Sequence, residues 1–217
     1  MKLKKIASLA LAGIMAVSML AGCNGNPTDP ETPTDPTTPA TGVSASLYNE
    51  LSLTAQRNIT MSNSSSLDAA LKKAVDDKVS ESAANSIYSG VTFENCDSKP
   101  TGSAAVVQTA LVDALDAVKG IGSINNSTKA GKTTTGVVVA MVGQGISEAT
   151  LLQETANWIN NAIEGYPVEG QDSDGKDCKY TYTGSASVVD KSFVDANGVA
   201  RTIKFVAVTV TCAAQEV

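Results

Sequence analysis

The chain has 217 residues, no histidine and a formal net charge of −6 at pH 7. The acidic balance and the lack of a basic run argue against a nucleic-acid partner, because such binding depends on neutralising phosphates. The lack of histidine removes the commonest general base and the commonest zinc ligand. No motif indicates a cofactor, and we expect none.

Residues 1–22 have the pattern of an export signal. Three lysines within the first five residues precede the apolar run 6–20, which is too short for a typical membrane-spanning helix. The run ends in Leu20-Ala21-Gly22-Cys23, which resembles the lipobox of bacterial lipoproteins. In that family a signal peptidase cleaves before the cysteine, whose thiol carries a diacylglyceryl group. The resemblance implies lipidation at Cys23 and a lipid anchor on the extracytoplasmic face of the cell membrane. The alternative is an ordinary secretory signal that contains a cysteine.

Segment 23–42 follows as a tether rich in proline and threonine. It has no large apolar side chain, so it cannot bury enough surface to offset its conformational entropy, and we expect it to be disordered. At roughly 3 Å per residue, such a chain reaches about 50–60 Å. The remaining residues, 43–217, are enough for a single globular domain with a core.

Four helices are predicted in this domain. Segment 66–86 has apolar residues at helical spacing, with Ser65 and Asp68 as a capping box. A second stripe, which runs from Ser103 to Val118, ends at Gly120, and a third begins after Ser147 and ends at Gly165. Segment 43–56 is the fourth predicted helix.

The predicted strands alternate with these helices. Thr133–Val142 is β-branched and apolar on both faces, which is typical of a buried central strand, and 91–95 is a shorter candidate. Segments 178–189 and 201–212 form two long strand-like runs. The element order ααβαβαββ predicts an α+β fold, with helices packed on a small antiparallel or mixed sheet.

Three cysteines remain after Cys23. If the last two strands form a hairpin centred near Asp195, Cys178 and Cys212 face each other and could form a disulfide. A tight turn at Asn197-Gly198 shifts the register by about five residues and breaks that pairing. A bond from Cys96 to either of the others, or three free thiols, are the alternatives.

Two further features suggest binding chemistry. Asp172, Asp174 and Asp177 lie around Gly175 and could hold a hard cation, although their spacing departs from a calcium-binding hand, and a polar loop is the simpler interpretation. Trp158 and Tyr166 could stack on a sugar, but Trp158 falls on the apolar stripe of its predicted helix, which favours a core position.

Five stretches taken together resemble bacterial CAP-domain proteins, also called SCP-like. They are "LYNELS" (47–52), "SSLDAALKKAVDDKVSES" (65–82), "YSGVTFENC" (88–96), "SAAVVQTALVDALD" (103–116) and "KTTTGVVVAMVG" (132–143). The resemblance implies an αβα-sandwich and carries Glu94 over as a residue of the family's metal-binding cleft. The chain lacks the two histidines of that cleft, which implies a non-catalytic or divergent member.

These observations favour a surface-displayed lipoprotein whose domain is a non-catalytic module that binds a ligand or interacts with the cell envelope. One alternative is a hydrolase of cell wall or glycan that uses Glu94 or Glu148 with Asp172 or Asp174. It would need two carboxylates about 5–9 Å apart. The other is a structural or assembly protein that offers a strand edge to a partner.

Overall fold

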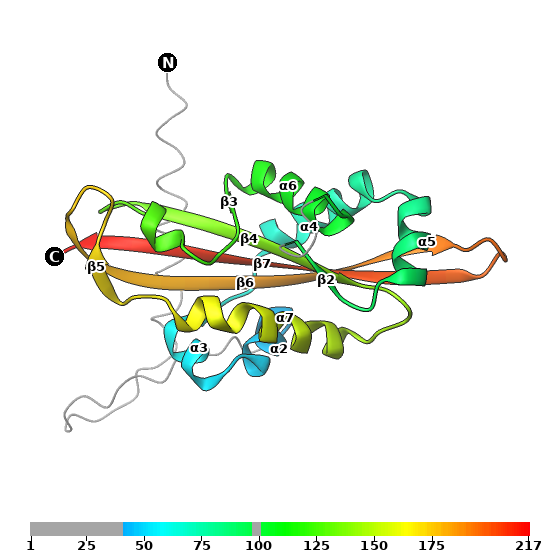
Figure 1. The fold of residues 1–217 in the computed structure, drawn as a ribbon, viewed down its shortest axis with the longest axis horizontal. Helices are drawn as coiled ribbons and strands as arrows, with labels where there is room; N and C mark the ends of the chain where they lie inside the picture. The colour runs from blue at the N-terminus through cyan, green and yellow to red at the C-terminus, as the bar shows by residue number, and fades with distance from the viewer. Residues whose placement is uncertain (1–40, 97–100) are drawn as a thin grey trace, which may run out of the picture. The chain divides into compact units, whose positions relative to one another are not determined.

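The computed structural model of the protein describes residues 41–96 and 101–217, and Figure 1 shows its ribbon. The predictions for Cys23, for segment 1–22 and for nearly all of segment 23–42 fall outside these residues. A mixed β-sheet lies between two layers of helices, which confirms the predicted α+β fold.

Three long strands form the centre of the sheet. They are β4 (Thr133–Val142), β6 (Asp177–Val194) and β7 (Ala200–Glu216). β6 and β7 form an antiparallel hairpin, and β4 pairs with the other edge of β7, also antiparallel. Short strands extend both edges: β1 (Thr60–Met61) and β5 (Glu169–Gln171) on β6, and β2 (Glu94–Asn95) and β3 (Val118–Lys119) on β4.

Helices cover both faces of this sheet (Figure 1). One layer contains α4 (Ser65–Lys78), α5 (Glu81–Gly90) and α6 (Ser103–Leu115). The other contains α2 (Val43–Glu50), α3 (Leu53–Asn58) and α7 (Glu148–Glu164). A short 3-10 helix, Ile124–Ser127, precedes β4.

The burial pattern of the strands shows where helices cover both faces of the sheet and where one face is open to solvent. Every residue of β4 from Val137 to Val142 is buried, as its continuous apolar sequence predicts for a central strand. In the first half of β6 only alternate residues are buried, because their neighbours face solvent. The buried side chains, from Leu47 to Ala214, form one core.

Two predicted helices are each split in two by a residue in extended conformation. The predicted helix 66–86 breaks at Val79 (φ −105°, ψ 101°), and the hydroxyl of Ser80 then accepts a hydrogen bond from Ala83 N to start α5. The predicted helix 43–56 breaks at Leu51, and Ser52 starts α3 in the same way. Both extended residues are buried, so tertiary packing outweighs the helical periodicity at these points.

The predicted helix boundaries have mixed outcomes. Ser147 caps α7 as expected, with its Oγ accepting from Thr150 N at 3.1 Å. The cap of α4 is Ser64 rather than Ser65. At α6, Gly102 occupies the cap position without a side-chain bond, and the helix ends early because Asp116 adopts a left-handed conformation (φ 50°).

Candidate functional site

The β6–β7 turn sets the hairpin register and so determines whether the predicted disulfide can form. The loop runs from Asp195 to Val199, and the side chain of Asp195 closes it by accepting from two backbone N–H groups. This places Cys178 opposite Glu216 and Cys212 opposite Tyr182, four residues out of the register that a bridge requires. The disulfide is therefore not formed. The three cysteines that the structure describes are buried free thiols, and burial raises the pKa of Cys178 and Cys212.

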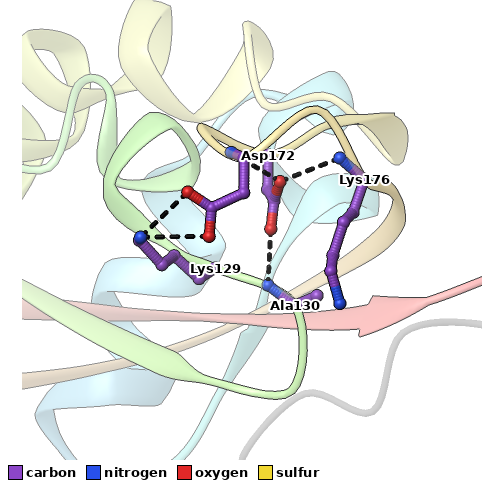
Figure 2. A network of polar contacts seen from close by, with 5 residues as sticks. Lys129, Ala130, Asp172 and Lys176 are labelled. Atoms are coloured by element: carbon purple, nitrogen blue, oxygen red, sulfur yellow. Dashed lines mark hydrogen bonds and ion pairs between the residues drawn. The ribbon is translucent and has the colours of Figure 1, made fainter.

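Asp172 has a structural role in the loop that contains Asp172, Asp174 and Asp177 (Figure 2). Its carboxylate is buried and accepts hydrogen bonds from the backbone N–H groups of Ala130 (2.9 Å), Asp174 (2.8 Å) and Lys176 (3.0 Å). These donors, Ala130 first, hold the pKa of Asp172 below its usual range. The carboxylate thus joins the 172–176 turn to the chain just before β4.

The other two aspartates of this loop point to different partners. Both oxygens of Asp174 pair with Lys129 Nζ at 2.9 and 3.0 Å, and Asp177 accepts from Gln171 Nε2 at 3.1 Å. In the described part of the chain, no three His, Cys, Asp or Glu side chains are grouped so that they could hold a metal ion. The three aspartates stabilise a loop and do not converge.

The carboxylates of the hydrolase hypothesis are also far apart. Glu94 is buried opposite Met141 on β4, whereas Asp172 is bonded to Ala130 beyond the other end of that strand. Eight residues of strand separate Thr133 from Met141, a length of about 26 Å. Glu148 is the first residue of α7, and the 17 residues of that helix, about 25 Å in length, separate it from the segment that leads to β5 and Asp172. None of these pairs can meet the spacing of about 5–9 Å that glycoside hydrolysis needs.

A different cluster of polar and aromatic side chains surrounds a surface pocket of about 230 Å³. We call it the tyrosine pocket, and its principal residues are Arg57, Thr60, Tyr166, Val168, Tyr180 and Tyr182. They come from the end of α3, from β1, from the segment after α7 and from β6. Tyr180 and Tyr182 lie two residues apart on the face of β6 that packs toward α7, and the stacked rings of Tyr166 and Tyr182 are 4.3 Å apart.

Two of the three tyrosine hydroxyls have partners in the protein. Tyr166 donates to the carbonyl of Ile121 at 2.8 Å, and Tyr182 donates to the carbonyl of Pro167 at 3.0 Å. Burial raises the pKa of all three phenols, so they are neutral hydrogen-bond donors at ordinary pH.

Tyr180 differs from the other two. Its side chain is buried, yet its hydroxyl has no hydrogen-bond partner within the described residues. Leaving such a group without a partner costs about 1–3 kcal/mol. At the rim, the exposed Arg57 forms no hydrogen bond or ion pair with any residue that the structure describes. The pocket therefore combines a hydroxyl donor, that of Tyr180, with a guanidinium, that of Arg57, and neither has a partner among the described residues.

Part of this pocket could be anticipated from the sequence. The alternation of Tyr180 and Tyr182 with polar residues predicts that they share one face of a strand, and Tyr166 is an aromatic candidate for binding a sugar. Arg57 and Thr60 carry no such signal, because nothing local indicates that α3 and β1 lie beside β6.

Comparison of the chain with protein-family models, with curated proteins and with solved structures finds no match. The lipobox and the CAP-domain resemblance therefore stay predictions. Among the helices in residues 41–96 and 101–217, none is long and apolar enough to cross a membrane.

Proposed function

We propose that this protein is a bacterial lipoprotein, anchored through Cys23, whose α+β domain is a non-catalytic binding module. The export signal, the cysteine that ends it and the proline-rich segment after it support the anchor and the tether. The tyrosine pocket supports the binding role.

The unpaired, buried hydroxyl of Tyr180 is the observation that carries the binding role. The hydroxyl has almost no exposed surface, so an acceptor from a ligand would reach it only when the lining side chains move apart; it would then recover the free energy lost by leaving the donor unpaired. Arg57 at the rim favours a ligand whose acceptor is negatively charged, since a guanidinium pairs with a carboxylate in charge-assisted hydrogen bonds. The aromatic rings and Val168 would contact an apolar body, as in most small-molecule sites.

The ligand class that fits is a small organic carboxylate. At about 230 Å³ the pocket is below the usual size for drug-like ligands, roughly 300–1,000 Å³, so the ligand must be compact. The pocket places no acidic side chain among its lining residues that would repel an anion.

Titration calorimetry on the full-length protein in detergent tests this proposal, with benzoate as the probe and benzamide as the neutral analogue. We expect benzoate to bind and benzamide to bind more weakly. Arg57→Gln should weaken benzoate binding by about ten- to a hundredfold, because a hydrogen bond to a charged group contributes about 1.5–3 kcal/mol. Lys72→Gln, which removes a positive charge from α4 on the other face of the sheet, is the matched control and should have no effect.

No binding of benzoate, or equal binding to wild type and Arg57→Gln, would contradict the carboxylate site. The anchor is tested separately. Cys23→Ser should be released from membranes on cell fractionation, and retention of the variant in the membrane fraction would refute lipidation at that residue.

A further inference from the structure

A second hollow lies on the same helical layer and has a different chemistry. It has a volume of about 370 Å³ and is formed by α7, by the loop after β3 and by β4 beneath them. We call it the tryptophan groove, and the residues that matter are Gly120, Ile121, Gly122, Val138, Trp158 and Asn161. Trp158 is the chain's one tryptophan, and it is partly exposed here rather than buried as its periodicity predicts.

The loop that forms one wall is held in place before any ligand binds. Gly120 N donates to the carbonyl of Val137 at 3.0 Å, and the hydroxyl of Tyr166 donates to the carbonyl of Ile121 at 2.8 Å. The loop lies directly on β4 because residue 136 is glycine: a Cβ there would overlap the backbone oxygen of Gly120. A preformed wall lowers the ordering cost of binding.

Trp158 and Asn161 form the opposite wall. They are three residues apart on α7 and so lie on the same side of the helix. Trp158 provides an aromatic face, and Asn161, which is exposed, provides a carboxamide that can both donate and accept. None of the residues that line the groove is charged.

This combination selects the chemistry of the ligand. The electron-rich face of an indole attracts the polarised C–H groups on one face of a sugar ring, and it buries that apolar face at the same time. A carboxamide and backbone polar groups can pair with hydroxyls at the ring edge. The uncharged lining gives no advantage to an ionic ligand, in contrast to the tyrosine pocket with Arg57.

We propose that the tryptophan groove is a binding site for a neutral pyranose unit of a glycan, which stacks on Trp158 and is hydrogen-bonded by Asn161. The two sites have no lining residue in common, and one hydrogen bond, from Tyr166 of the tyrosine pocket to Ile121 of the groove, links them.

The intrinsic fluorescence of Trp158 provides the assay. The full-length protein in detergent is titrated with methyl β-D-glucopyranoside, and with sorbitol as an acyclic polyol that has no ring face. We expect a saturable change in emission with the glucoside and none with sorbitol. Asn161→Ala should weaken glucoside binding by about two- to tenfold, since a neutral hydrogen bond contributes about 0.5–1.5 kcal/mol.

The controls separate this site from the other one. Gln153→Ala removes an exposed carboxamide from α7 outside the groove and should leave binding unchanged. Arg57→Gln should also leave glucoside binding unchanged, whatever it does to benzoate. The absence of a saturable change with the glucoside, an equal response to sorbitol, or unchanged affinity in Asn161→Ala would each overturn the proposal.

Discussion

Replacing Tyr180 with phenylalanine should stabilise the domain, the opposite of what removing a buried hydroxyl usually does. The ring of Tyr180 lies next to Gly170: a Cβ built on that glycine would be 3.6 Å from Tyr180 Cε2. The substitution keeps this ring in place and removes only the hydroxyl that lacks a partner. An unsatisfied buried hydroxyl costs about 1–3 kcal/mol. We expect the lower end, a gain of about 1 kcal/mol in the free energy of unfolding, because the ring lines a pocket that is open to solvent.

Tyr166 and Tyr182 provide matched comparisons in the same pocket. In each, the change to phenylalanine removes a hydrogen bond to a carbonyl, at 2.8 Å to Ile121 and at 3.0 Å to Pro167. Each of these variants should lose about 1 kcal/mol, and more where the carbonyl is left buried without a partner. Tyr180→Phe should therefore be separated from the other two by about 2 kcal/mol.

Urea denaturation monitored through Trp158 emission measures the three differences. In a domain of this size, 1 kcal/mol corresponds to a shift of about 2–4 °C in Tm, so thermal melting gives a second measurement. If Tyr180→Phe is destabilised as much as Tyr166→Phe, the Tyr180 hydroxyl has a partner in solution. The hydroxyl would then need no acceptor from a ligand.

Three further outcomes are expected from the fold. Gly136→Ala should lower the free energy of unfolding by about 1–3 kcal/mol in urea denaturation, because the added methyl group overlaps the backbone of Gly120. Gly122→Ala should be nearly neutral, because nothing lies within 4 Å of a Cβ added there, and equal effects of the two substitutions would contradict the packing. Asp172 contributes stability that is complete above its usual pKa, near 4, and is lost as the pH falls through its lowered pKa in the folded state. Asp172→Asn should therefore be less stable than wild type at neutral pH. The difference between the two free energies of unfolding should narrow below about pH 4 when stability is measured as a function of pH, and a difference that stays constant would refute this. Ser147→Ala should cost about 1 kcal/mol in the same denaturation assay through loss of the α7 cap, and an unchanged midpoint would show that the cap contributes nothing.

The local elements follow largely from the sequence. Thr133–Val142 has the same bounds as predicted, and from Val137 to Val142 it is buried on both faces, because this continuous apolar run has no polar side to expose. Ser147 starts α7 where predicted, since a serine cap and the apolar stripe after it are encoded within a few neighbouring residues. The breaks at Leu51 and Val79 are not visible in the helical period, because burial of these residues against distant parts of the chain decides them.

Register and site depend on contacts between residues that are distant in sequence. A four-residue difference in the hairpin separates Cys178 from Cys212, and the bonds of Asp195 within its loop set that difference. The aspartates near Gly175 suggest a cation site when they are read as a motif. In the fold their oxygens are occupied by backbone N–H groups and by Lys129.

By itself, the sequence of this protein determines the order and type of its main elements, and it predicts the lipid anchor at Cys23. Both depend on short-range patterns, which survive when a segment is considered in isolation. The tertiary structure alone decided that Arg57, Tyr166 and Tyr180 surround one pocket and that Trp158 is partly exposed in a groove. The physical reason is that these positions arise from packing α3, β1, α7 and β6 against one another, and no local pattern encodes that packing.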